Sequence, residues 1–260
     1  MRLHCNPAVV MIEIQDIYKS FGDNEVLKGI SGKFEAGVTN LIIGGSGSGK
    51  TTLLKCMIGL HQPEEGSVLY DDREFTHLNF EQRIEIRKEI GMLFQGSALF
   101  DSMTVEENVM FPLNMFTDQV RSEKLDRVNF CLDRVNLEGK NKLFPAELSG
   151  GMKKRVGIAR AIAMNPKYLF CDEPNSGLDP KTSIVIDELI KELTEEYNTT
   201  TIVVTHDMNS VMGIGDYIIF LHEGKKFWEG SNKEIAKTDI EELNDFVFAS
   251  RFMKAAKGKF

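Results

Sequence analysis

Residues 38–58, VTNLIIGGSGSGKTTLLKCMI, decide how the chain folds. The apolar run at its start predicts a strand, and the apolar spacing after the glycines is typical of a helix. Glycines between the two let backbone N–H groups surround an anion without Cβ clashes, and a helix N-terminus behind them favours negative charge. This stretch therefore predicts a strand, a phosphate-binding loop and a helix, in that order.

The loop also has the spacing G-x-x-x-x-G-K-[ST], which holds the phosphates of a nucleotide. We expect Lys50 to reach the β- and γ-phosphates and Thr51 to offer its hydroxyl to Mg²⁺. A flexible glycine turn is the alternative, but a chance match in a chain of this length is expected in about one case in a hundred. The predicted nucleotide contacts are Gly44, Gly45, Ser46, Gly47, Ser48, Gly49, Lys50, Thr51 and Thr52.

Strand and helix patterns alternate on both sides of this loop. Near-continuous apolar strands between helices indicate an α/β fold with a mostly parallel sheet that helices cover on both faces. Strands are expected at 11–21, 66–70, 90–95, 168–172, 199–205 and 216–222, and helices at 51–60, 78–89, 180–197, 207–215 and 239–250. Residues 104–165 have only helical patterns, which predicts a helical subdomain over about 97–165.

Composition excludes several classes of protein. The chain has 260 residues, 42% of them hydrophobic, and a net charge of −8, which is unsuited to disorder or to binding nucleic acid. No apolar stretch reaches the ~18 residues of a membrane span. Cysteines with apolar neighbours and no C-x-x-C pair favour a reducing compartment. The basic tail, residues 251–260, is expected to be a solvated end.

A second motif, which ends in two acidic residues, lies at 168–173 (YLFCDE). Ligands in such sheets bind at the carboxyl ends of parallel strands. Because neighbouring strand residues point to opposite faces, the strand end must bend for both carboxylates to serve one site. We expect Asp172 to hold Mg²⁺ and Glu173 to orient or deprotonate the attacking water.

The phosphate loop, the LFCDEP strand and the fragment Leu148-Ser149-Gly150-Gly151 occur in the order and spacing of ATP-binding-cassette (ABC) ATPases. The chain resembles that family over residues 11–235, followed by a C-terminal helix and basic tail at 236–260. The resemblance implies the nucleotide-binding fold of P-loop ATPases, with an N-terminal antiparallel β region, and it implies ATP and Mg²⁺ as cofactors.

The resemblance also implies that two copies of the chain enclose ATP between them. Ser149, Gly150 and Gly151 of one copy would face the γ-phosphate held by the other, although these residues also fit a simple helix cap. Three further positions match family residues. Phe21 matches the aromatic residue that stacks on adenine, and His206 matches the histidine that contacts the γ-phosphate. Asp179 belongs to the stretch that matches the loop linking the two sites. A core position is the alternative for Phe21.

Gln95 matches the glutamine that senses Mg²⁺, water and the membrane partner, and the sequence around it resembles one subfamily. In Gln95–Phe100, in Asn108–Leu113 and at Met152 the chain is similar to the ATPases of MCE-type (Mla) lipid transporters. Residues 177–180, Gly-Leu-Asp-Pro, have instead the ordinary cassette form. Residues 96–116 would dock a permease through exposed Leu99, Phe100, Met103 and Phe111, unless these side chains only pack the helical subdomain.

The resemblance implies an ATPase, located on the cytoplasmic face of the inner membrane, that powers phospholipid transport. Its expected partners are a second copy, an integral-membrane permease and an MCE-domain lipid-binding protein, and no nucleic acid. Two alternatives stay open: the ATPase of another importer, for amino acids or metals, and a soluble iron–sulfur assembly ATPase. Where the latter usually has an acidic residue, this chain has Met152.

Overall fold

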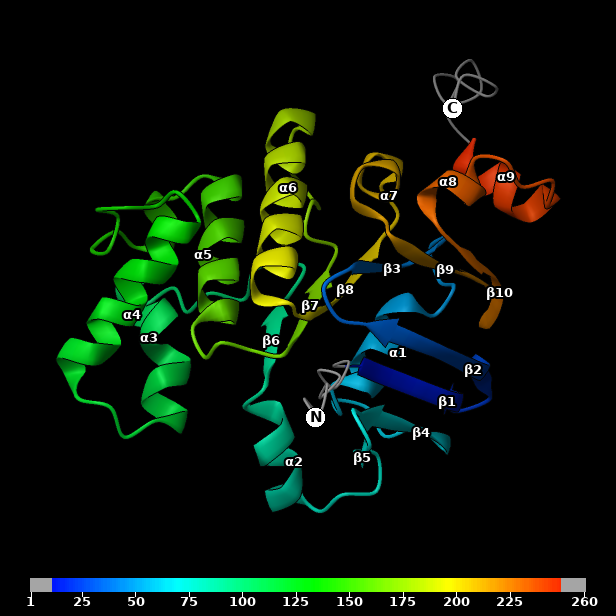
Figure 1. Cartoon of the computed structure of the whole chain (residues 1–260), viewed down its shortest axis with the longest axis horizontal. Coiled ribbons are helices and arrows are strands. Elements are labelled where there is room, and N and C mark those ends of the chain that lie inside the picture. The colour runs from blue at the N-terminus through cyan, green and yellow to red at the C-terminus, as the bar shows by residue number, and fades with distance from the viewer. Residues whose placement is uncertain (1–10, 249–260) are drawn as a thin grey trace, which may run out of the picture.

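The computed structural model describes residues 11–248. Its first layer is a four-stranded antiparallel sheet in the order β2-β1-β4-β5. The strands are β1 (Met11–Phe21), β2 (Asn24–Glu35), β4 (Glu65–Tyr70) and β5 (Arg73–Glu74). In Figure 1 this sheet lies on one side of the molecule, beside α1. The sequence predicted β1 and β4, but the first two thirds of β2 and the two-residue β5 were not predicted. A strand as short as β5 shows no period.

The second sheet has six strands in the order β10-β9-β3-β8-β7-β6. Its members are β3 (Thr39–Gly44), β6 (Ile90–Leu93), β7 (Tyr168–Asp172), β8 (Thr200–Thr205), β9 (Tyr217–His222) and β10 (Lys225–Gly230). The five from β9 to β6 pair in parallel and β10 pairs antiparallel. The expected mostly parallel sheet is confirmed. Strand β10 was not predicted, because its residues are only exposed or half-buried and make no apolar run.

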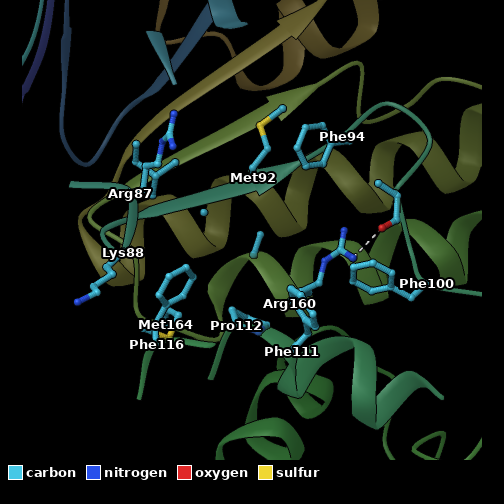
Figure 2. Close-up of a pocket in the computed structure, with 14 residues that line it drawn as sticks. Arg87, Lys88, Met92, Phe94, Phe100, Phe111, Pro112, Phe116, Arg160 and Met164 are labelled. Atoms are coloured by element: carbon cyan, nitrogen blue, oxygen red, sulfur yellow. Dashed lines mark hydrogen bonds between the residues drawn. The ribbon is translucent and has the colours of Figure 1, made fainter. Parts of the chain in front are cut away.

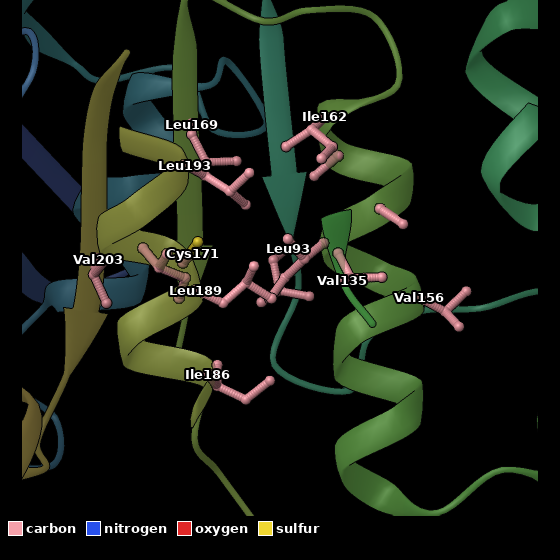
Figure 3. Close-up of a cluster of buried hydrophobic side chains, with 14 of the residues drawn as sticks. Leu93, Val135, Val156, Ile162, Leu169, Cys171, Ile186, Leu189, Leu193 and Val203 are labelled. Carbon is pink, nitrogen blue, oxygen red and sulfur yellow. The ribbon is translucent and has the colours of Figure 1, made fainter. Parts of the chain in front are cut away.

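Helices cover both faces of this sheet, as predicted. The helices outside the segment 97–165 are α1 (Lys50–Met57), α2 (Phe80–Arg87), α6 (Pro180–Tyr197), α7 (Met208–Ile214), α8 (Asn232–Ile235) and α9 (Glu241–Val247). Alternate strand residues enter two cores: Ile42 and Phe170 pack with α1 and the antiparallel sheet, and Leu41 and Leu169 pack on the other face. Figure 3 shows the second core, where Leu169, Cys171 and Val203 of the strands meet Ile186, Leu189 and Leu193 of α6.

The segment between β6 and β7 contains helices α3 (Val105–Phe116), α4 (Arg121–Arg134) and α5 (Gly150–Ile162), with a 3₁₀ turn at Pro145–Glu147. These helices gather beside α6, on the side of the molecule away from the antiparallel sheet (Figure 1). A capping box starts α3, in which Thr104 and Glu107 bond each other's backbone N–H groups. The helical patterns of this region are confirmed.

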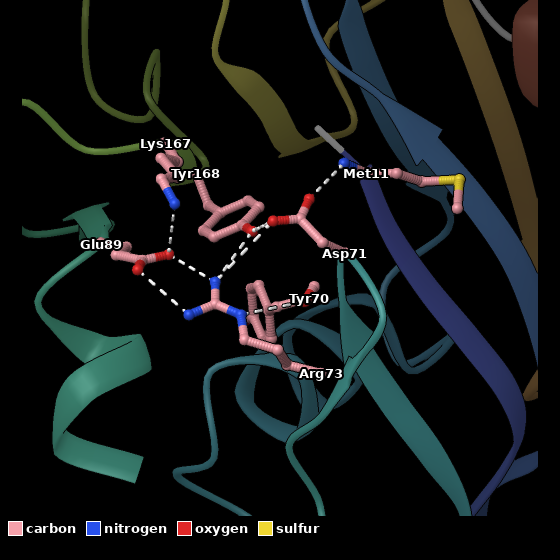
Figure 4. A network of polar contacts seen from close by, with 7 residues as sticks. All are labelled: Met11, Tyr70, Asp71, Arg73, Glu89, Lys167 and Tyr168. Atoms are coloured by element: carbon pink, nitrogen blue, oxygen red, sulfur yellow. Dashed lines mark hydrogen bonds and ion pairs between the residues drawn. The ribbon is translucent and has the colours of Figure 1, made fainter. Parts of the chain in front are cut away.

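A polar cluster, Asp71, Arg73, Glu89, Lys167 and Tyr168, joins the two sheets and is called here the amino-end clamp (Figure 4). The Arg73 guanidinium donates to both carboxylate oxygens of Glu89, at 3.1 and 2.5 Å. The Tyr168 hydroxyl donates to Asp71 at 2.9 Å and accepts from Arg73 at 3.3 Å. Because β7 begins at Tyr168, the clamp ties the start of that strand to the antiparallel sheet.

The C-terminal helix α9 packs Leu243 and Val247 into the second core. It is shorter than the predicted 239–250, and residues 249–260 with the basic tail lie outside the described part of the chain, as do residues 1–10. Cys56, Cys131 and Cys171 are buried free thiols, as expected. Among residues 11–248, no helix is both long and apolar enough to cross a bilayer.

Candidate functional site

A cleft of about 1010 Å³ opens where β3, β7 and β8 end. These three strands pair side by side and in parallel, so their carboxyl ends lie at one edge of the sheet. The phosphate loop follows β3, the acidic pair ends β7, and His206 follows β8. With Gln95, which follows β6, the sheet brings together predicted residues from four separate parts of the sequence. The predicted residues that line the cleft are Gly45, Ser46, Gly47, Lys50, Thr51, Gln95, Glu173 and His206.

The phosphate loop is held against β9 at Gly44. A Cβ on this residue would lie 2.3 Å from the Leu221 carbonyl oxygen, so only glycine fits. Lys50, the first residue of α1, donates from Nζ to the carbonyls of Gly44 and Gly45, both at 2.9 Å. Burial lowers the pKa of Lys50, against the opposing charges of Glu173 and Asp172.

The loop fits a phosphate group. Gly45 and Gly47 have open space where a side chain would stand, so an anion can approach the backbone closely. The buried hydroxyl of Ser48 has no hydrogen-bond partner in the described chain, which leaves a polar group for a ligand to satisfy. Thr52, in the first turn of α1, is half-buried and does not line the cleft.

Oxygen ligands for Mg²⁺ meet beside this loop. Thr51 donates from Oγ1 to Asp172 Oδ1 at 3.3 Å. Burial raises the pKa of Asp172, while the Thr51 bond works in the opposite direction. Within residues 11–248 no three His, Cys, Asp or Glu side chains gather as a metal site. The oxygens of Thr51 and Asp172 suit a hard cation whose remaining ligands are water and phosphate.

The predicted bend at the end of β7 is present at Glu173. Its φ of 47° lies in the left-handed region, which is costly for a residue with a side chain. The bend turns the Glu173 carboxylate toward His206, whose Nδ1 is 2.9 Å from Oε1. The glutamate side chain is 12% exposed and the histidine 67%. Strain of this kind is found at functional sites.

Gln95 joins the cleft from the other side. Its Nε2 donates to Ser176 Oγ at 3.4 Å, and its backbone carbonyl accepts from Lys154 Nζ. Lys154 also donates to the Glu173 carbonyl at 3.2 Å and is 4% exposed. This buried lysine ties Gln95 to Glu173, and burial lowers its pKa. Sequence reasoning missed Lys154, because in sequence it is one of three consecutive basic residues, a pattern more typical of an exposed face.

Some predicted site residues do not line the cleft. Within the two motifs these are Gly44, Ser48, Gly49, Thr52 and Asp172, and outside them they are Phe21, Ser149, Gly150, Gly151 and Asp179. Ser149 caps α5, accepting from the Met152 N–H at 3.3 Å, and Gly150 and Gly151 form the first turn. Asp179 caps α6 through bonds from Lys181 and Thr182. Phe21 is 47% exposed, with its ring against His61 at a centroid distance of 5.3 Å, so the core alternative for Phe21 is wrong.

An apolar pocket of about 400 Å³ lies between β6, α3 and α5 (Figure 2). Phe100 and Phe111 line it with their ring centroids 4.8 Å apart, and Phe100 is 40% exposed. The expectation that Leu99, Met103 and Phe111 are exposed is wrong, because all three are half-buried and Leu99 packs against the second core. The other lining residues include Met92, Phe94, Pro112, Phe116, Arg160 and Met164.

The sequence model of one protein family, described as ABC transporter, matches residues 27–176. The chain belongs to the ABC transporter family. The matched segment runs from β2 through the phosphate loop and α5 to the bend after β7. ABC cassettes bind ATP with Mg²⁺ and hydrolyse it to drive transport, so this chain is an ATPase with those cofactors.

Named relatives are transport proteins. The chain is 36% identical over 245 residues to the "Probable ribonucleotide transport ATP-binding protein mkl" of Mycobacterium leprae, covering 94% of this chain and 71% of the relative. It is 43% identical over 237 residues to the methionine import ATP-binding protein MetN of Clostridium tetani, covering 91% and 74%. A lipid cargo is not named among these relatives.

Solved ABC cassettes have the same fold. A dimeric cassette in a post-hydrolysis state, bound to ADP and Pi, superimposes with a TM-score of 0.78 at 34% identity, covering 85% of this chain and 98% of that one. The cbiO1 cassette of Clostridium perfringens gives a TM-score of 0.82 at 29% identity, covering 95% and 98%. The expected ABC ATPase fold is confirmed.

Several cleft residues of this ABC ATPase had no sequence signal. Phe246 and Val247 line the cleft from α9, although they lie about 200 residues beyond the phosphate loop. Their side chains also pack on the second core, where Phe246 meets Phe220 at a ring distance of 5.3 Å. Neither residue lies in a motif, so only the folded chain shows this contribution.

Proposed function

We propose that this chain is the ATP-hydrolysing subunit of an ABC transporter in which Glu173 is the general base. The contact between Glu173 and His206 beside the phosphate loop carries this proposal. A carboxylate there accepts a proton from the attacking water, a step worth about 10²–10⁴-fold in rate. His206 contacts the γ-phosphate and orients the carboxylate, and Gln95 orients water near Mg²⁺.

The remaining assignments follow the same geometry. Lys50 neutralises charge on the β- and γ-phosphates, and Thr51 and Asp172 hold the cation, whose role is to neutralise phosphate charge. Phe21, exposed on the antiparallel sheet, stacks on adenine. Ser149, Gly150 and Gly151 act on ATP held by a second copy, since they do not line the cleft of their own chain. Asp179 links the two sites from the start of α6.

The apolar pocket is the proposed docking site of the permease, on the cytoplasmic face of the inner membrane. Phe100 and Phe111 present aromatic surface there, and Arg160 holds the neighbouring loop through the carbonyls of Ser97 and Ala98. An apolar pocket of this kind accepts a short amphipathic helix. The ATPase unit is assigned to residues 11–235, with its helical subdomain at about 97–165.

For the cargo we favour phospholipid, handled with an MCE-domain partner. The support is the resemblance of residues 92–113 and of Met152 to that subfamily. Methionine is the second candidate, because methionine import proteins are among the relatives with the highest identity named here. The iron–sulfur assembly alternative is disfavoured, since the named relatives are transport proteins.

Purification of the tagged chain from membranes in mild detergent tests this proposal, with bound proteins and lipids identified by mass spectrometry. A multispanning permease with an MCE-domain protein and phospholipid is the expected result. A permease without lipid, in a complex whose ATPase rate rises with methionine, would replace the cargo but keep the ATPase assignment. Recovery of soluble scaffold proteins alone would contradict the transporter role.

A further inference from the structure

Three buried polar side chains join the two segments that carry Glu173 and His206. Asn175 donates from Nδ2 to Asp187 Oδ1 at 2.8 Å and to Ser210 Oγ at 3.0 Å. Asn175 is 8% exposed, Asp187 is 6% exposed and Ser210 is fully buried. They come from the loop after β7, from α6 and from α7. Buried polar groups are costly unless their bonds are satisfied, so this cluster has a structural consequence.

The cluster lies directly behind the proposed catalytic pair. Asn175 follows Glu173 by two residues and lines the cleft itself. Ser210 follows His206 by four residues, in the first turn of α7. Bonds from Asn175 to both α6 and α7 therefore fix the spacing between the Glu173 loop and the His206 loop, whose side chains meet at 2.9 Å.

The charge of Asp187 decides which way the Asn175 amide points. An ionised carboxylate only accepts hydrogen bonds, so the amide must present its NH₂ group. The amide oxygen of Asn175 is buried and has no hydrogen-bond partner. A protonated Asp187 would instead donate its O–H to that oxygen, which favours turning the amide over. The cluster thus has two hydrogen-bond arrangements that differ by one proton from solvent.

The surroundings of Asp187 bring these two arrangements within reach of ordinary pH. Burial raises the pKa of Asp187 to about 6, and the bonds from Ser210 and Asn175 work in the opposite direction. The charged groups facing it are Asp207 before α7 and Glu188 on α6, which also raise its pKa, and the Cys171 thiol of β7 lies close enough to interact. The two hydrogen bonds favour the ionised carboxylate, whereas burial and the two neighbouring acids favour the protonated one.

We propose that Asn175, Asp187 and Ser210 are positioning residues that hold Glu173 and His206 in register for hydrolysis, and that the arrangement with ionised Asp187 is the productive one. The inference rests on the proposed role of Glu173. It adds that protonation of Asp187, which is not itself a catalytic residue, controls the rate of hydrolysis. Small displacements of catalytic groups cost up to about 10²-fold in rate, so a turned amide next to Glu173 has a measurable effect.

The Asp187→Asn variant tests this, because a neutral amide imitates the protonated acid by donating to Asn175. In the full chain, kcat at pH 8 should fall about tenfold, to the level of the wild type at low pH, while KM for MgATP changes less than about twofold. Part of the acid limb of the wild-type pH profile should disappear. An unchanged kcat and an unchanged acid limb would overturn the proposal.

Ser210→Ala is the second variant, and it keeps the carboxylate. Loss of one hydrogen bond to the charged form makes Asp187 easier to protonate. The acid limb should therefore move to higher pH, which a merely structural role does not predict. An acid limb at the wild-type position in folded Ser210→Ala would contradict the proposal, even if Asp187→Asn fails to fold.

Thr194→Val is the matched control. Thr194 is also buried on α6 and bonds Thr201 Oγ1 at 2.7 Å, at the far end of the helix from the cleft. This variant should lower the melting temperature and leave kcat and the pH profile unchanged. A similar change of pH profile in Thr194→Val would show that any loss of α6 packing has the same effect, and would overturn the specific role of the cluster. Failure of the proposed role of Glu173 is distinguishable from failure of this inference, because the ATP turnover of a separate Glu173→Gln variant tests that role directly.

Discussion

Strand β7 ends in two different polar networks. At its amino end, Tyr168 belongs to the amino-end clamp, where Arg73 meets both oxygens of Glu89 and Lys167 adds a second cation at 3.4 Å. At its carboxyl end, Asp172 and Glu173 stand next to a strained backbone, with buried polar atoms of Ser48 and Asn175 unsatisfied. The two networks lie at opposite ends of a strand of five residues.

The difference shows where this chain favours stability and where it favours function. In the clamp, acids and bases are matched, so its bonds contribute to holding the two sheets together. In the cleft, acceptors, donors and a left-handed φ are retained although they destabilise the fold, which is expected where a ligand completes the site. Substitutions at the two ends should therefore change different quantities.

The largest effect is expected from Glu173→Gln, at the cleft end. The amide keeps the shape of the side chain but cannot accept a proton from water, so ATP turnover should fall by about 10²–10⁴-fold. Binding of ATP, measured by fluorescence titration with a labelled nucleotide, should be retained. The melting temperature should change little, because the contact with His206 is partly exposed.

Glu81→Gln serves as the control for that experiment. Glu81 is an exposed residue in the first turn of α2 and should leave turnover unchanged. Turnover near the wild-type rate in Glu173→Gln would show that another group activates the water.

The second effect belongs to the amino end. Arg73→Met removes the guanidinium but keeps most of the apolar stem, so Glu89 and the Tyr168 hydroxyl lose a donor. Loss of a charged hydrogen-bond partner at a half-buried site costs about 1–3 kcal/mol. The urea midpoint should fall accordingly, while kcat below the melting temperature stays within about twofold, because the clamp is at the other end of β7. A large loss of kcat in folded Arg73→Met would erase the distinction between the two ends.

The smallest effect is a pH dependence of that stability difference. Burial tends to raise the pKa of Glu89, but the bonds and charges of Arg73 and Lys167 outweigh burial and hold it below the ordinary value. The clamp is therefore fully stabilising above the ordinary glutamate range and loses its contribution as the pH falls through the lowered pKa. Urea midpoints of wild type and Arg73→Met should differ equally at pH 8 and 6, and the difference should shrink only when the pH falls below the ordinary glutamate range.

How far the sequence predicts this molecule follows from how local each signal is. Residues 38–58 predict their strand, loop and helix because glycines and apolar spacing act within one segment. The end of β7 is also a local signal, because an apolar run ends there in two acidic residues. The bend at Glu173 follows from the need to bring these two adjacent carboxylates to one site. The sequence also predicts a site at the carboxyl ends of parallel strands, and the structure shows that β3, β7 and β8 are the strands that form it.

Features that depend on distant partners were not predictable. Lys154 is buried because two loops place carbonyls around its ammonium group, and Asp187 is buried because Asn175 and Ser210 reach it from other elements. From the sequence alone, Lys154 and Asp187 are indistinguishable from ordinary charged residues on the exposed face of a helix. The exposure of Leu99 was wrong for the same reason: the loop before α3 turns it onto the second core.

The separation of Ser149 from the cleft of its own chain has a kinetic consequence. On the proposed arrangement, one copy holds half of each of two sites, so at low concentration the rate of hydrolysis rises with the square of the protein concentration. A newly made chain would then leave cellular ATP intact until it meets a second copy. A permease that tethers two copies raises their effective concentration to about the millimolar range. Assembly itself would thereby act as the switch that starts ATP consumption, without a separate inhibitor.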